Sequence, residues 1–400
     1  MNSAETLTTE DTQRNKIVLD DVTDKQIDSA VDGFIQVAAG AHPAVVREPG
    51  LFLVNPDLKK VRTFIHAAGA LPVTRPEVLA YLGYSEGFIK GLEPKDFIEL
   101  YAEIHNIVEI WETAETLMKE TGATFITFHT ELKSLSQDIL AHSLMQADNL
   151  YEGQVGDVTD LETRFGGKPL GEGELRKLPA LIELAKELVT VVGGHEQKAA
   201  RVKGVLKAFR KSLRDAKDDV QRMRAQAADN DGREMIRVLD ESLNMLDQRI
   251  EERGKTYDTY AEYTWVGAWW GPLGLAISYS IYSGKASAVK SEYNSLIESK
   301  NELKNKISNL EKGMASLLNI QADLQGLELL ASEALNGAAN IENIWAIIGQ
   351  HITDSVERLK NTTTTTQLFL FKSRLSTMLE HWAEISKHAS ALLENIAHHD

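Results

Sequence analysis

Few residues in this sequence have types and spacings that could perform chemistry. The most suggestive set lies near the C-terminal end, where His381, Glu384 and His388 are three and four residues apart. On a helix this spacing places all three side chains on one face, where they could touch a metal ion. Surface and capping roles are far commoner for such residues. We therefore expect no metal site.

A glycine-rich run at 165–173, FGGKPLGEG, has some likeness to a phosphate-binding loop. It lacks the complete G-x-x-x-x-G-K-[ST] pattern and follows no predicted strand, so we interpret it as a linker. The sequence contains no H-E-x-x-H or G-x-S-x-G motif, and it has no cysteine that could pair with a histidine. We expect a protein that is not an enzyme and needs no cofactor.

The most informative residues form a charge-free run of 22 residues at 263–284, YTWVGAWWGPLGLAISYSIYSG. Its length is at the threshold for crossing a bilayer once as a straight helix. The central GPLG at 271–274 favours a turn instead. Two helical arms of eight to ten residues would each reach roughly 12 to 15 Å, about half the hydrocarbon core.

Aromatic residues gather around this run in the way an interfacial membrane anchor requires, since Trp and Tyr favour the membrane–water interface. We interpret the run as a membrane-contacting head, and two alternatives stay open for it. It could be packed core, or it could fold under a flanking helix and be released by lipid. The predicted membrane-binding residues are Trp265, Val266, Trp269, Trp270, Pro272, Leu273, Leu275, Ile277, Tyr279, Ile281 and Tyr282.

Composition excludes several classes of partner and chemistry. The formal charge of −16 argues against a nucleic-acid partner, and the absence of cysteine excludes disulfides and thiol catalysis. The first residues, MNSAETLTTEDTQRNK, are acidic where a signal peptide needs a basic region and then an apolar one. We expect synthesis in the cytosol, and any export must use another route than a conventional signal peptide.

Long helices must position the head. Only one proline, Pro272, follows Pro179, which leaves room for very long helices. Pro94 is predicted to open a long amphipathic helix, 151–180 is a glycine-rich boundary or loop, and Gly193–Gly194 is predicted to interrupt the next helix. The Thr tract at 361–366 predicts a turn or a frayed stretch.

Two apolar repeats with coiled-coil spacing flank the head. The first covers 202–227, breaks phase at DNDG (229–232) and resumes over 236–250. The second covers 293–324 and includes the polar Gln321 at one of its seam positions. Such arms pair in antiparallel fashion, and they predict a stalk on the order of 70 to 90 Å long.

The first repeat also carries a basic stripe beside its apolar seam. A solvated helix face is the commoner reading, and an acidic neighbouring subunit is the alternative. The stripe consists of Lys203, Lys207, Arg210, Arg214, Lys217 and Arg224.

We therefore predict an all-α fold, an elongated helical tail bundle with a coiled-coil stalk and an apolar hairpin head at its tip. Residues 1–20 are a flexible leader, and residues 21–200 and 331–400 form the tail bundle. The stalk comprises 201–262 and 285–330, and 263–284 is the head.

This architecture resembles the helical pore-forming toxins of the cytolysin A superfamily, in particular the A components of the two-component alpha-xenorhabdolysin toxins. The head and the KASAVKSEYNSLIESK that follows it are the specific elements of the likeness, which covers 90–400 in architecture. The resemblance implies a subunit that binds a target-cell lipid membrane through its head. It then recruits a B component and assembles into a hetero-oligomeric ring.

Three other functions remain open. A coiled-coil protein could span the bilayer once through 263–284, and it would then need detergent for purification. A cytosolic coiled-coil scaffold would bind a protein partner at its tip and never associate with liposomes. A single-component pore would need no B component.

Overall fold

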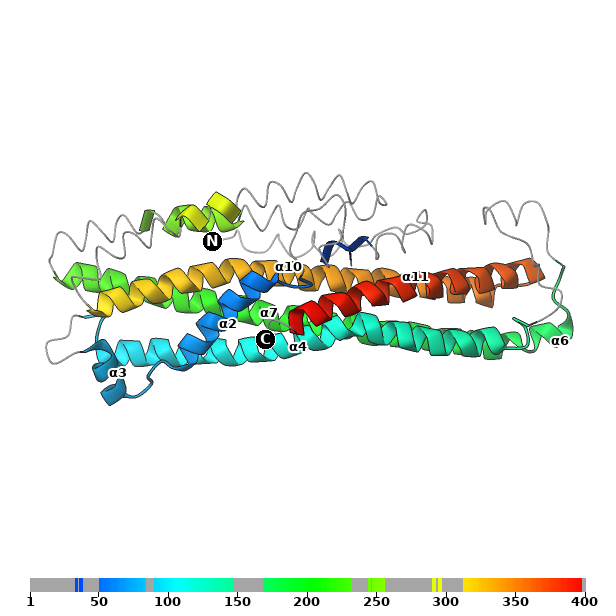
Figure 1. Cartoon of the computed structure of the whole chain (residues 1–400), viewed down its shortest axis with the longest axis horizontal. Helices are drawn as coiled ribbons and strands as arrows, with labels where there is room; N and C mark the ends of the chain where they lie inside the picture. The colour runs from blue at the N-terminus through cyan, green and yellow to red at the C-terminus, as the bar shows by residue number, and fades with distance from the viewer. Residues whose placement is uncertain are drawn as a thin grey trace, which may run out of the picture.

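The computed structural model is an elongated bundle of long helices (Figure 1). It describes residues 33–34, 36–38, 50–83, 90–146, 168–231, 244–245, 247–255, 290–292, 294–296 and 312–397. Within these ranges the regular elements are all helices, and one isolated β-bridge joins Pro169 to Thr364. The predicted all-α class is confirmed. The predicted leader and head lie outside the described residues.

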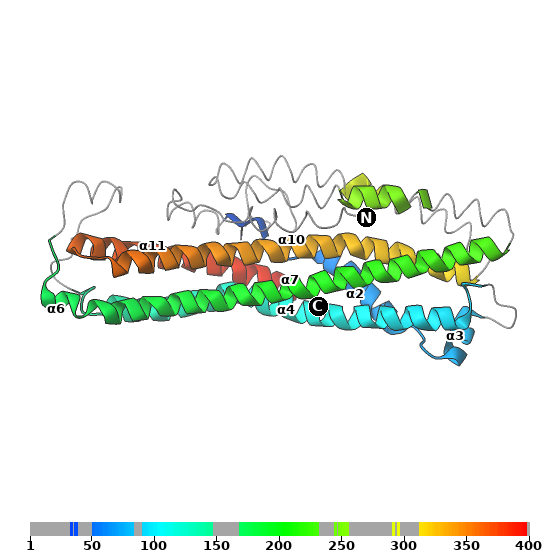
Figure 2. The same ribbon diagram turned by 180° about the vertical axis from the view of Figure 1, so that it is seen from behind.

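Four long helices make the bundle: α4 (Pro94–Ala141), α7 (Leu178–Asp231), α10 (Lys312–Lys360) and α11 (Thr365–Ala397). Helix α7 packs against both α10 and α4, and α11 packs against α4. The two opposed views show these helices running along the long axis (Figures 1 and 2). With 54 residues, α7 is about 80 Å long.

Shorter helices accompany the four long ones. Helices α2 (Asn55–Gly69) and α3 (Arg75–Leu82) pack on α4, and the single turn α6 (Glu172–Leu175) precedes α7. Helix α4 begins at Pro94, as predicted, because Glu93 and Asp96 form a capping box in which the Glu93 amide donates to Asp96 Oδ2 at 3.0 Å.

Aromatic side chains from all four long helices meet in one cluster in the core. Phe128 of α4 packs edge-on against Trp382 of α11, with ring centroids 4.6 Å apart. His195 of α7 lies 4.8 Å from the Trp345 ring of α10, and Trp345 stacks at 5.1 Å on Phe125. These contacts tie the four helices together at one level of the bundle.

Two glycines do not interrupt α7 where we predicted a break. The helix continues through Gly193 and Gly194, and Val192 and Ala199 on either side are fully buried. A glycine weakens a helix by only about 1 kcal/mol, and burial of the flanking residues overrides that penalty.

The predicted turn at the Thr tract is confirmed. Helix α10 ends at Lys360 and α11 begins at Thr365. The Leu170 amide donates to the Thr363 carbonyl at 2.8 Å, and the Thr365 amide donates to the Lys168 carbonyl at 3.0 Å. The end of the glycine-rich run is therefore tied to this turn.

Candidate functional site

The predicted membrane-binding residues, from Trp265 to Tyr282, lie outside the described residues, so their role stays a prediction. The structure does describe the chain on both sides of them. We call residues 244–245 and 247–255 the outgoing segment, and residues 290–292 and 294–296 the return segment. Arg253 Nε and Glu292 Oε1 are 3.0 Å apart, so the two segments lie side by side.

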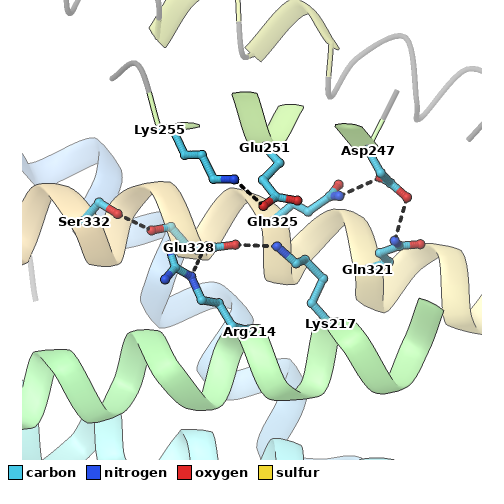
Figure 3. A network of polar contacts seen from close by, with 9 residues as sticks. All are labelled: Arg214, Lys217, Asp247, Glu251, Lys255, Gln321, Gln325, Glu328 and Ser332. Atoms are coloured by element: carbon cyan, nitrogen blue, oxygen red, sulfur yellow. Dashed lines mark hydrogen bonds and ion pairs between the residues drawn. The ribbon is translucent and has the colours of Figure 1, made fainter. Parts of the chain in front are cut away.

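The outgoing segment is fixed to the bundle through the Asp247 carboxylate. Its Oδ2 accepts hydrogen bonds from Arg224 Nη1 at 3.1 Å and from Gln321 Nε2 at 2.8 Å, and its Oδ1 accepts one from Gln325 Nε2 at 2.6 Å. Figure 3 shows the two glutamines reaching Asp247 from α10. Arg224 of α7 also donates to Gln321 and to Asn244 Oδ1. We call these five residues the Asp247 network.

The Asp247 network is buried except for Asn244, which is exposed. Arg224 is 1% exposed, Asp247 is 6% exposed and Gln321 is fully buried. A charge this deep is strongly unfavourable unless a partner neutralises it and hydrogen bonds satisfy its remaining atoms. Arg224 supplies the opposite charge, and the two glutamines supply the additional hydrogen bonds.

The Asp247 network corrects the predicted course of the first coiled-coil arm. In one straight helix Arg224 and Asp247 would be about 35 Å apart, whereas their side chains touch. The chain therefore reverses after α7 ends at Asp231, and the outgoing segment lies back along α7 and α10. The division into tail, stalk and head stays a prediction.

The basic stripe of α7 faces acidic side chains of the same chain. Glu328 of α10 accepts from Arg214 and, at 2.8 Å, from Lys217 (Figure 3). Lys203 pairs with Glu342 at 2.6 Å. Burial acts to raise the pKa of Glu328, but Lys217 and Arg214 outweigh it and lower the pKa. Arg214 remains 48% exposed, so these pairs do not contradict a solvated face, and the contact with a neighbouring subunit stays a prediction.

The return segment has its own attachment through Lys290. Its Nζ lies 2.6 Å from Glu333 Oε1 of α10 and 2.9 Å from Asp57 Oδ2 of α2. Burial acts to lower the pKa of Lys290, but Glu333 and Asp57 outweigh it and raise the pKa. Lys290 therefore keeps its positive charge between two carboxylates.

A polar cavity of about 220 Å³ lies between the outgoing segment and helices α7 and α10. Glu251 and Lys255 line its outer side, and Glu328 and Ser332 of α10 line its inner side (Figure 3). Its charged lining residues balance: the positive ones are Arg210, Arg214, Lys217 and Lys255, and the negative ones are Asp218, Asp247, Glu251 and Glu328. The cavity is therefore a neutral polar space rather than an anion-binding site.

The other candidate sites either have structural roles or lie outside the described residues. Within the described residues no group of three potential metal ligands comes together. The surroundings of the Glu384 and His388 side chains are outside the description. At the described end of the glycine-rich run, the Gly171 amide donates to Glu174 Oε2 at 2.7 Å, which caps α6. None of the described helices has an apolar stretch long enough to cross a bilayer.

Sequence reasoning did not find the Asp247 network or the Lys290 attachment. One signal was present, because Gln321 occupies a seam position of an otherwise apolar repeat, where a polar residue needs a partner. The identity of that partner depends on the chain reversal after α7. No local pattern encodes the contact between Asp247 and Gln321.

No family model and no curated protein matches the chain. Among solved structures, the chain has the fold of the alpha-pore forming toxin components. Soluble SmhA, of the tripartite alpha-pore forming toxin Smh from Serratia marcescens, superposes with a TM-score of 0.50 at 10% identity. The match covers 95% of this chain and 96% of SmhA.

Two further structures are similar at lower TM-scores. YaxA from Yersinia enterocolitica is 22% identical, with a TM-score of 0.43 over 87% of this chain and 98% of YaxA. XaxA from Xenorhabdus nematophila is 17% identical, with a TM-score of 0.43 over 88% of this chain and 98% of XaxA. The fold expected from the resemblance is confirmed by the likeness to SmhA.

Proposed function

We propose that the chain is a subunit of a bacterial two-component pore-forming toxin that binds target membranes through the head at 263–284. The observation that carries the proposal is a charge-free aromatic run whose two flanks meet at the Arg253–Glu292 ion pair. The fold shared with SmhA, a component of an alpha-pore forming toxin, supports the same conclusion.

The position of this ion pair supports a hairpin. The point midway along the chain between Arg253 and Glu292 falls at residues 272 and 273, within the GPLG turn sequence. Two arms of a hairpin centred there would each reach about half the hydrocarbon core. Burying their apolar surface would drive insertion at roughly 25 cal/mol per Å².

A half-depth anchor leaves the pore lining to another subunit, which is the B component of our proposal. The head has no polybasic cluster beside it, so it selects membranes by hydrophobic contact rather than by anionic lipid. In this proposal the chain is made in the bacterial cytoplasm, is released, and then acts at the host cell membrane within a hetero-oligomeric ring.

Flotation with liposomes and dye release test the proposal. The detergent-free chain is measured alone and then with the product of its neighbouring gene. We expect flotation by the chain alone and leakage only with both proteins. Leakage by the chain alone would mean a self-sufficient pore former. Neither flotation nor leakage under either condition would favour the coiled-coil scaffold.

Charges placed in the head should abolish membrane binding. Replacing Trp269 and Trp270 together by Glu puts two carboxylates into the apolar run, where each charge costs about 2 kcal/mol or more in a bilayer. We expect flotation to fall at least about tenfold. The matched control is Tyr81→Glu, which changes a 58% exposed aromatic residue of α3. Unchanged flotation of the double variant, with helicity intact, would refute the anchor.

A further inference from the structure

We propose that the Asp247 network and Lys290 together form a latch that holds the outgoing and return segments on the bundle and opens before the protein attaches to a membrane. The purpose of this latch rests on the proposed function. Its existence can be tested without membranes.

The described residues of the two segments attach to the bundle through few buried apolar side chains and through ion pairs. Among their described side chains, the buried apolar ones are Ile250 and Leu296, and Met245 is 61% exposed. Asp247, which is buried, and Lys290, which is 27% exposed, supply the ion pairs to the bundle, one on each segment. The α7 and α10 seam, in contrast, is apolar, with buried residues that include Val202, Leu206, Phe209, Leu213, Leu317 and Leu324.

A polar attachment of this kind is specific but easily reversed. Buried ion pairs add little net stability compared with apolar packing, because water would solvate the same charges when the segments lift away. The cavity of about 220 Å³ beneath the outgoing segment removes dispersion contacts as well. Lifting the segments should therefore require much less free energy than separating α7 from α10.

The two segments can leave the bundle as one unit. The Arg253–Glu292 pair joins them to each other, and both side chains are 43% exposed, so this contact does not depend on burial against the bundle. Opening breaks the contacts of Asp247 with Arg224 and α10 and those of Lys290 with Asp57 and Glu333. It leaves the connection between the segments intact.

Spin-label distances test the latch directly. The chain has no cysteine, so labels can be placed at Glu251→Cys and Ser332→Cys, on opposite sides of the cavity. We expect one short distance in the parent protein. Adding Asp247→Ala should raise the population at long distance about tenfold or more, because Arg224 loses its buried partner. A distribution unchanged by Asp247→Ala would overturn the latch.

Two further variants test the latch if Asp247→Ala fails to fold. If circular dichroism shows that Asp247→Ala has lost helicity, Asp247→Asn keeps the side-chain shape while removing the charge. Lys290→Ala breaks the second attachment without touching the Asp247 network. Each is expected to increase the long-distance population, and a distribution that neither changes would overturn the latch.

A reversible crosslink connects the latch to membrane binding. A bis-methanethiosulfonate crosslinker bridges the same two cysteines, and flotation is measured with vesicles of phosphatidylcholine and cholesterol. We expect at least a tenfold loss of flotation, restored by a reducing agent. The matched control bridges Lys203→Cys and Glu342→Cys, which join α7 to α10 away from the two segments.

The outcomes separate this inference from the proposed function. Full flotation of the crosslinked latch variant would overturn a need for opening. Loss of flotation in both crosslinked variants would overturn it too, since the effect would not be specific to the latch. If the unmodified protein never floats, the proposed function fails, and the latch is judged on the spin-label distances alone.

Discussion

His195 is a titratable side chain enclosed by the aromatic cluster of the bundle. It is 3% exposed, its Nε2 lies 2.8 Å from Glu131 Oε2, and its ring packs against Phe128 and Trp345. Burial lowers the pKa of His195, and Lys198 acts in the same direction, which together outweigh the opposing effect of Glu131. The folded bundle therefore holds this imidazole in its neutral form.

This pKa shift predicts that the bundle loses stability in mild acid. The folded state binds a proton less readily than the unfolded state, so stability is complete above the unfolded pKa of about 6.5 and falls as the pH drops below it. His195→Gln should reduce the loss between about pH 7 and pH 5 by on the order of 1 kcal/mol. Denaturant titrations followed by circular dichroism at each pH measure the free energy of unfolding of both proteins. A stability–pH profile that His195→Gln leaves unchanged would contradict the assignment.

At the scale of elements, the apolar repeats predicted the long helices well, because the apolar spacing of a buried helix face can be read from a short stretch of sequence. The repeat from Val202 to Ala227 lies on α7 with its apolar residues buried, and the helix opening at Pro94 was placed correctly. The reversal after Asp231 was not predicted, because the same apolar spacing resumes beyond it. The choice between a straight arm and a reversed one depends on the distant partners of Asp247.

Helix α10 comes close to the 51–53 loop at one glycine. A Cβ on Gly337 would lie 2.9 Å from Phe52 Cα and 3.1 Å from the Leu51 carbonyl oxygen, and both are backbone atoms. Gly337→Ala should therefore lower the free energy of unfolding by about 1 to 3 kcal/mol. Gly326→Ala is the matched control on the same helix, where a Cβ would meet nothing within 4 Å. It should be neutral or stabilising by up to about 1 kcal/mol. Equal denaturation midpoints for the two variants would refute the close approach.

At the scale of the whole molecule, the fold class was predictable from sequence, whereas the way the flanks of 263–284 sit on the bundle was not. The head itself stays a prediction. A charge-free aromatic run is a local property that any reader of the sequence can find. Lys290 contacts Asp57 and Glu333, which lie far from it along the chain in opposite directions. Such contacts follow from how complete helices pack, so they emerge only once the bundle is assembled.

The aromatic cluster makes the four long helices one cooperative unit, and Trp345 is its central member. Trp345 is fully buried, and its ring lies 5.2 Å from Phe128, 4.8 Å from His195 and 5.8 Å from Trp382. Trp345→Ala should lower the free energy of unfolding by about 3 to 5 kcal/mol.

Trp345→Phe supplies the matched variant. The Trp345 indole Nε1 has no hydrogen-bond partner among the described residues, so replacement by Phe loses no hydrogen bond and should cost less than about 1.5 kcal/mol. Hydrogen exchange measures the response helix by helix. In the Ala variant we expect protection to fall together in α4, α7, α10 and α11, because each contributes a ring to the cluster or packs directly on it. Loss of protection confined to α10 would mean that the helices open separately, and the bundle would not then be a rigid platform from which the two segments lift.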